Sequence, residues 1–346
     1  MNRKLHGFPL AMVFVIVAGV LFAVFIGIST AESQTPYEIQ VPLGLRPVPI
    51  PGDNPMTVEK VELGKMLYFE KRLSKKKDIS CATCHIPDYA YTEPKPVSEG
   101  IDGQKGNRNA PTVINTAYMS TMFWDGREPD LEHQAGGPVE NPIEMGAKMA
   151  DVAADLNTIP EYQKRFQQVF GAPASKDTIT KAIAAFERTI LSGNSPYDKF
   201  VNGDSNALSP KAKAGYELFK GKALCITCHT PPLFTGASFY NAGVGMDKKE
   251  PDLGRMKVTG LESDKGAFRA PALREIANTA PYFHDGSVEN LDDAVRFMAA
   301  GGRDNPNLFP IFRAMPKLTP DEIDRLVEFM KALSGEYPVV KEPKLP

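Results

Sequence analysis

Two short motifs contain all four cysteines of this 346-residue chain: residues 81–85 read CATCH and residues 225–229 read CITCH. In a CxxCH motif the two thiols add to the vinyl groups of a haem, and the histidine coordinates the iron from one face. Two disulfides or a zinc site with four cysteine ligands would use the same cysteine spacing, and a thioredoxin-like pair would not need the histidine. Because both motifs are complete and use every cysteine, the sequence favours two covalent c-type haems. The attaching thiols are those of Cys81, Cys84, Cys225 and Cys228.

The N-terminus predicts export. Arg3 and Lys4 precede an unbroken apolar run over residues 8–28, and small residues follow at 29–31. This pattern is typical of a secretory signal, although the run exceeds the usual ~7–15 apolar residues and is long enough to span a bilayer. Residues 1–31 are therefore either a cleaved signal peptide or a membrane anchor. Both alternatives place the remaining chain outside the cytoplasm, and we expect a periplasmic protein, soluble or anchored.

The composition is that of a globular protein. Apolar residues make up 42% of the chain and charged residues 24%, which excludes a disordered chain and a polytopic membrane protein. The 40 basic residues are balanced by 42 acidic ones, so no basic field favours nucleic acid as a partner.

The two halves of the chain resemble each other beyond the cysteines. An Ala-Pro pair at 110–111 is followed by FWDG at 123–126, and an Ala-Pro pair at 270–271 is followed by FHDG at 283–286. The interval from proline to aspartate is 14 residues in both halves, so Trp124 and His284 occupy equivalent positions. This repeat predicts a duplicated haem domain.

Helical patterns dominate the predicted secondary structure, and strand patterns are few. Capping residues at Ser209, Asn290 and Thr319 predict helices that run to about Lys220, to Met298 and to a stop at Gly335. An apolar stripe over residues 179–190 predicts a further helix. The fold class is therefore all-α, with two tandem cytochrome c-like domains at 45–195 and 205–335, a linker at 193–206, and long Gly/Pro-rich loops at 86–108 and 230–268 that point to function.

Several longer segments identify a family. The chain resembles the bacterial di-haem cytochrome c peroxidases over nearly all of residues 50–335, in segments 63–74, 80–85, 108–112, 123–127, 137–142 and 279–286. The resemblance implies an active-site haem in the N-terminal domain and an electron-transfer haem in the C-terminal domain. It makes His85 and His229 the proximal iron ligands and Met298 the second ligand of the electron-transfer iron. A thioether opposite a histidine raises the reduction potential.

The resemblance also implies roles in catalysis and in a metal site. Trp124, the only tryptophan, matches the residue that lies between the two haems. Gln134 and Glu144 match distal-pocket residues of the peroxidatic haem, where Glu144 would act as general acid–base. The ligands of a calcium ion between the domains, two of them backbone carbonyls, would be Asn109, Thr279 and Pro281.

One position departs from the family pattern. Many members close the peroxidatic haem with a second histidine on the loop after CxxCH, and they open it only when the other haem is reduced. Ile101 occupies that place here and cannot bind iron. We therefore expect an enzyme that needs no reductive activation, unless Lys105, Met119 or Met122 supplies a ligand.

The leading function is the reduction of hydrogen peroxide to water with electrons from a small c-type cytochrome or a cupredoxin. A first alternative is a relative that oxidises residues of a partner protein, as in the maturation of methylamine dehydrogenase; that relative carries tyrosine where Met298 stands here. A second alternative is a di-haem electron carrier without catalysis. The resemblance further implies a homodimer.

Overall fold

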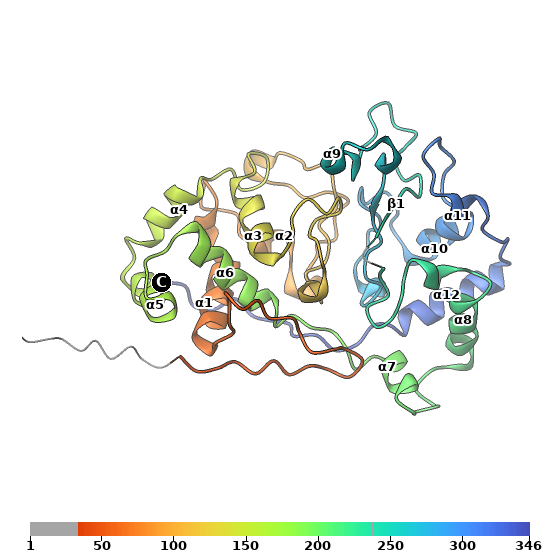
Figure 1. Cartoon of the computed structure of the whole chain (residues 1–346), viewed down its shortest axis with the longest axis horizontal. Helices are drawn as coiled ribbons and strands as arrows, with labels where there is room; N and C mark the ends of the chain where they lie inside the picture. Colours follow the sequence, from red (N-terminus) through yellow and green to blue (C-terminus); the bar gives the residue numbers. More distant parts are fainter. Residues whose placement is uncertain (1–33, 237) are drawn as a thin grey trace, which may run out of the picture. The chain divides into compact units, whose positions relative to one another are not determined.

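The computed structural model describes residues 34–236 and 238–346, so the predicted signal or anchor at 1–31 lies outside the described residues. Within that part of the chain, no helix is both long and apolar enough to cross a membrane. Helices and long loops form two halves, α1 to α6 in one and α8 to α12 in the other (Figure 1). The α-helices are α1 (Val58–Phe69), α2 (Cys81–Cys84), α3 (Leu131–Glu140), α4 (Met149–Leu156), α5 (Pro160–Phe170), α6 (Lys176–Glu187), α7 (Pro196–Val201), α8 (Pro210–Lys220), α9 (Met256–Thr259), α10 (Leu291–Ala299), α11 (Pro310–Arg313) and α12 (Pro320–Lys331).

Strand structure is as sparse as the sequence predicts. Two short strands, β1 (Phe239–Tyr240) and β2 (Phe268–Arg269), pair antiparallel. Single 3₁₀ turns shape the loops: η1 (Lys71–Leu73), η2 (Pro87–Tyr89), η3 (Ile101–Gly103), η4 (Thr116–Tyr118), η5 (Cys225–Thr227), η6 (Glu262–Asp264) and η7 (Ile276–Asn278).

The two halves are built around the same helix crossing. A Cβ atom added to Gly64 of α1 would lie 1.9 Å from the backbone oxygen of Ala182 in α6. A Cβ atom added to Gly215 of α8 would lie 1.9 Å from the backbone oxygen of Arg325 in α12. Only glycine permits this close approach of two helices. The shared crossing aligns α6 with α12, so the sequence repeat is also a structural one.

Most predicted helix boundaries are confirmed. Side chains of Ser209, Asn290 and Thr319 cap α8, α10 and α12, each by accepting a hydrogen bond from the backbone N–H three residues on. The stop at Gly335 is wrong, because α12 ends at Lys331. Gly335 instead packs against the backbone of Gly193, to which a Cβ would be 1.9 Å away.

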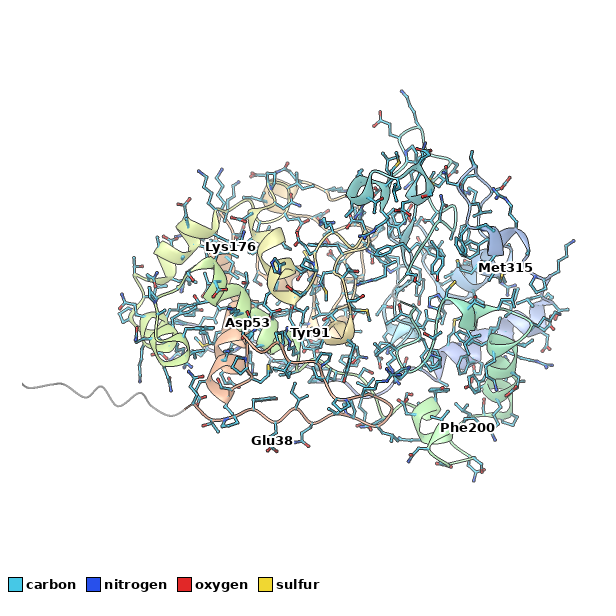
Figure 2. All side chains as sticks on the ribbon, viewed as in Figure 1. Glu38, Asp53, Tyr91, Lys176, Phe200 and Met315 are labelled. Atoms are coloured by element: carbon cyan, nitrogen blue, oxygen red, sulfur yellow. The ribbon has the colours of Figure 1, made fainter. Side chains whose placement is uncertain are left out.

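The predicted linker at 193–206 is also wrong in part, since it contains helix α7. Ser195 caps this helix and Pro196 occupies its first turn. Asp198 then forms an ion pair of 2.7 Å with Arg274, and both side chains are 1% exposed. Apolar side chains fill each half around its helices, and Tyr91, which is fully buried, lies within the N-terminal half (Figure 2).

Candidate active site

Both motif histidines are anchored in the same way. The Nδ1 atom of His85 lies 3.3 Å from the backbone oxygen of Tyr91, and that of His229 lies 2.8 Å from the backbone oxygen of Phe234. Burial lowers the pKa of both rings, which favours neutral imidazole. When Nδ1–H donates to a carbonyl, the lone pair of Nε2 remains free for a metal.

The four motif sulfurs lie with these histidines in two separate cavities. Cys81 and Cys84 line the cavity of His85, and Cys225 and Cys228 line that of His229. Burial raises the pKa of the Cys84 thiol to about 11 and that of Cys225 to about 12. Within residues 34–236 and 238–346 the four thiols form no disulfide. No three histidine, cysteine, aspartate or glutamate side chains lie close enough together in this part of the chain to hold a metal ion.

The C-terminal cavity is apolar and has a volume of about 200 Å³. Met298 of α10 lines it together with His229. The structure thus brings these two side chains into one cavity, and the role of Met298 as an iron ligand stays a prediction. Other apolar side chains of the lining are Leu273, Leu291, Val295, Leu326 and Met330.

The N-terminal cavity is larger, about 620 Å³, and carries polar groups. Gln134 of α3 and Glu144 of the following loop both line it, and so does Trp124. His85 is the only histidine among its lining residues. His133, next to Gln134, is exposed in the first turn of α3 and pairs with Asp130 at 2.6 Å, with its ring outside the cavity lining.

The place of the missing histidine is filled by a core residue. Ile101 is 4% exposed and packs in the apolar core, and its backbone N–H donates to the carbonyl of Glu144 at 2.7 Å. Of the three alternative ligands, Met122 lines the cavity, whereas Lys105 and Met119 do not.

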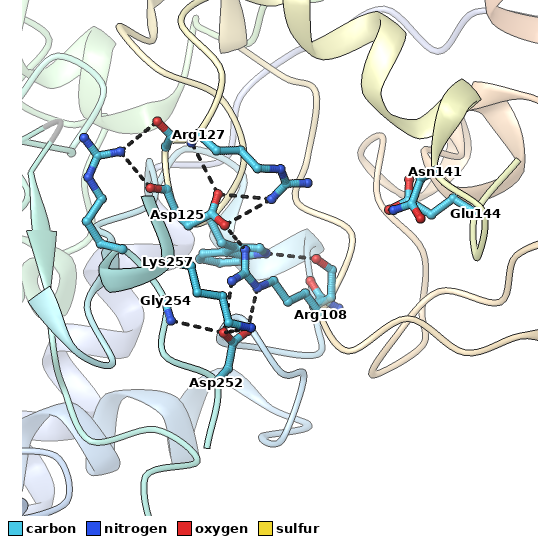
Figure 3. Close-up of polar contacts among 12 residues, drawn as sticks. Arg108, Asp125, Arg127, Asn141, Glu144, Asp252, Gly254 and Lys257 are labelled. Atoms are coloured by element: carbon cyan, nitrogen blue, oxygen red, sulfur yellow. Dashed lines mark hydrogen bonds and ion pairs between the residues drawn. The ribbon is translucent and has the colours of Figure 1, made fainter. Parts of the chain in front are cut away.

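Glu144 is held in place by its own loop. Its Oε1 accepts a hydrogen bond of 2.7 Å from Nδ2 of Asn141. Burial raises the pKa of Glu144, and the guanidinium of Arg127 partly opposes this shift. Arg127 stacks over the ring of Phe123 at 3.4 Å, and its side chain extends from the Asp125 network toward Glu144 (Figure 3). A carboxyl with a raised pKa beside an open cavity is suited to proton transfer.

Trp124 lies at the seam of the two halves, because it lines both cavities. Its indole N–H donates to the carbonyl of Asn109 at 2.9 Å, and the N–H of Asn109 donates to the carbonyl of His284 at 2.7 Å. His284 lines the C-terminal cavity and stacks on Phe268 with ring centroids 3.5 Å apart. A short hydrogen-bonded path thus connects Trp124 with the wall of the second cavity.

Ion pairs join the two halves beside this path. Arg108 contacts Asp125 of its own half and Asp252 of the other, each at 2.7 Å (Figure 3). The hydrogen bonds and the positive charge of Arg108 lower the pKa of Asp252, although burial alone would raise it. Arg255 donates from the C-terminal half to the carbonyls of Asp125 and Gly126. These contacts fix the position of the loop that carries Trp124.

Comparisons with known proteins agree with this arrangement. The sequence profile of the di-haem cytochrome c peroxidase family matches residues 58–206, and that of cytochrome c matches residues 212–334. Cytochrome c551 peroxidase of Nitrosomonas europaea is 41% identical over 86% of this chain and 86% of its own. The chain belongs to the di-haem cytochrome c peroxidase family. This di-haem peroxidase is an oxidoreductase that acts on peroxide, and it consists of two tandem cytochrome c-type domains.

Two further relatives show the breadth of the family. The methylamine utilization protein MauG of Methylorubrum extorquens is 37% identical to the peroxidase over 86% of this chain and 85% of its own. The crystal structure of a MauG-like protein associated with microbial copper homeostasis superimposes with a TM-score of 0.80 at 33% identity, covering 89% of this chain and 99% of that one.

The family implies two haem c groups, and the residues of the peroxidase fit them. Each cavity combines two buried thiols with a neutral histidine whose Nδ1 is already engaged, which is the donor set of haem c. The structure offers weaker support for calcium.

The backbone N–H of Asn109 donates a hydrogen bond to His284, whose loop also carries Thr279 and Pro281. The calcium site stays a prediction.

Two residues of the cavities were missed from the sequence. Glu187 lines the N-terminal cavity, is 5% exposed, and has an Oε2 atom without a hydrogen-bond partner. Burial raises its pKa to about 8. It lies four residues after Ile183 on the predicted apolar stripe, so an acid on a buried face was a usable signal. Arg269 lines both cavities, and its place depends on tertiary contacts that no local pattern shows.

Proposed function

We propose that this enzyme reduces hydrogen peroxide to two waters in the N-terminal cavity, with two electrons that enter through the C-terminal domain from a small exported cytochrome or a cupredoxin. The observation that carries the proposal is the difference between the cavities. His229 shares its cavity with Met298, whereas His85 shares its larger cavity with Gln134 and Glu144.

The different roles of the two cavities follow from the residues that line them. Haem bound through His85 would supply the open coordination position, and haem bound through His229 and Met298 would supply electrons at a high potential. Glu144 accepts the proton of one peroxide oxygen and returns it to the other, so that water leaves. The amide of Gln134 orients peroxide by hydrogen bonding. Each turnover consumes one peroxide, two electrons and two protons and gives two waters.

Trp124 carries charge between the cavities in this proposal. It lines both of them and is hydrogen-bonded through Asn109 to the segment of His284. An indole ring is the most readily oxidised side chain at this seam, so it is suited to transfer single electrons.

The oxidised enzyme is active without reductive priming. Support comes from Ile101, which is packed in the core, and from the cavity lining, where His85 has no second histidine opposite it. Met122 is the competing ligand, because it lines the same cavity.

Rapid mixing of the oxidised enzyme with peroxide tests the proposal. We expect an immediate spectral change at one haem, and a high-spin EPR signal before mixing. Inertness until one-electron reduction would refute the open site. The variant Met122→Leu serves as the control, since it removes the competing ligand and should leave the spectrum of an open site unchanged.

Oxidation of a partner protein is the second candidate, because the MauG relative is 37% identical over most of the chain. Met298, in place of that relative's tyrosine, favours the peroxidase.

The remaining proposals follow from sequence: domains at 45–195 and 205–335, export to the periplasm, a homodimer, and calcium bound by Asn109, Thr279 and Pro281.

A further inference from the structure

Arg269 is a cation without a counter-charge at the seam of the two domains. Its Nη1 donates to the carbonyl of Thr121, its backbone N–H donates to the carbonyl of Trp124 at 2.9 Å, and its Nε is buried without a partner. Within residues 34–236 and 238–346, no carboxylate forms an ion pair with it. Burial lowers its pKa to about 10, with no opposing acid.

The other buried arginines of this protein are paired. Arg274 contacts Asp198, Arg188 contacts Glu132, and Arg108 contacts two aspartates. Burial of a charge is costly unless an opposite charge accompanies it. The exception at Arg269 therefore indicates that its partner is not part of the polypeptide.

The position of Arg269 identifies the class of that partner. Besides Trp124, it belongs to the few side chains that line both cavities. In the repeat, the Ala-Pro pairs at 110–111 and 270–271 align Arg269 with Asn109, which is neutral. One guanidinium thus stands where the duplication could have placed two, and it faces both haem sites.

We propose that Arg269 binds propionate carboxylates of both haems, as a shared counter-charge at the domain seam. A haem carries its two propionates on the edge opposite the vinyl groups, and the vinyl edge is fixed here by the cysteines. A guanidinium is planar and offers donors in a fork, so it can serve two carboxylates at once. The inference rests on the proposed function, since it needs a haem in each cavity.

Redox titration of the complete two-haem enzyme tests the inference. Haem content is measured first, by mass and by the pyridine haemochrome spectrum, because a missing haem would contradict the proposed function and not this inference alone. Arg269→Gln removes a positive charge beside the propionates. This loss favours the more positively charged oxidised state of each haem, so the reduction potentials of both haems fall. The expected change is about tenfold in each oxidised-to-reduced ratio at fixed potential, which is about 59 mV for a one-electron couple.

Arg255→Gln is the matched control. Arg255 also crosses the seam and donates to two backbone carbonyls, but it lines neither cavity. Its potentials should equal those of the wild type. Two unchanged potentials in Arg269→Gln would overturn the inference, as would wild-type potentials that follow chloride concentration, which would indicate a small-anion site.

Arg269→Lys keeps the test decisive if the glutamine variant does not assemble. A lysine is a point charge and cannot bridge two carboxylates in the same geometry. We expect the potential of one haem to fall while the other holds. Two potentials equal to the wild type would count against a shared fork.

Discussion

Replacing Glu144 by glutamine separates its proton chemistry from its place in the fold. Glutamine has the same shape and keeps an oxygen for the 2.7 Å hydrogen bond from Asn141. A general acid–base contributes about 10²–10⁴-fold, which corresponds to about 3–5 kcal/mol of transition-state stabilisation. We expect peroxide turnover to fall by that factor, while the spectra of both haems stay nearly unchanged.

The pH dependence adds a second measurement. Burial raises the pKa of Glu144, so the wild-type rate should rise with pH through a value above the ordinary 4.5, and Glu144→Gln should lack this rise. The stability of the fold changes with pH in the opposite direction to the rate. Because the native state holds the proton more tightly than the unfolded state, wild-type stability falls as pH increases above about 4.5, and the variant escapes this loss. From pH 4 to pH 7 the melting temperature of Glu144→Gln should therefore increase relative to that of the wild type.

Glu140→Gln is the control for both measurements. Glu140 lies on the neighbouring α3, is exposed, pairs with Lys176 at 2.7 Å and does not line the cavity. Its loss should leave turnover unchanged. Equal turnover in Glu144→Gln and the wild type would refute the acid–base role and make Glu144 a structural residue.

Three further predictions concern the haems and the fold. Met298→His should give the C-terminal haem two histidine ligands and lower its potential; a redox titration that overlays the wild type would count against Met298 as ligand. Cys225→Ser should impair attachment of the C-terminal haem alone, so the mass should fall by one haem; loss of both would argue against independent sites. Asp198→Asn should cost about 3–5 kcal/mol in denaturant unfolding, because it leaves Arg274 buried without a counter-charge, whereas Lys211→Ala, at an exposed and solvent-screened pair, should leave the unfolding midpoint nearly unchanged.

The sequence predicted the parts of the fold that local chemistry determines. Ser209, Asn290 and Thr319 cap helices because a side-chain oxygen three residues before a free N–H suffices, and no distant contact is needed. Helix α7 had the same signals at Ser195 and Pro196, but its polar composition favoured a linker. What stabilises it is the buried contact of Asp198 with Arg274, 76 residues away, which no local pattern shows.

The candidate site was predictable to a similar depth. Through the family resemblance, the sequence assigned Gln134 and Glu144 to one distal pocket and Trp124 to the region between the haems; in the structure the first two line the N-terminal cavity, and Trp124 lines both cavities. It gave no indication of Arg269, since the role of that residue depends on the meeting of two domains. Isoleucine cannot bind iron, and the structure adds that Ile101 packs in the apolar core and is not among the residues that line the cavity.

The duplication explains how one fold supports two different sites. The helix crossing aligns Glu187, which lines the N-terminal cavity, with Met330, which lines the C-terminal one, so an ionisable group of one cavity is replaced by an apolar group in the other. Peroxide reduction must move protons, which requires groups that can be charged near the reacting oxygens. Electron transfer requires little rearrangement, and an apolar lining around a thioether disfavours the more highly charged oxidised state. The substitutions therefore match the chemistry proposed for each half, while the glycine-mediated crossing that both halves retain keeps the framework constant.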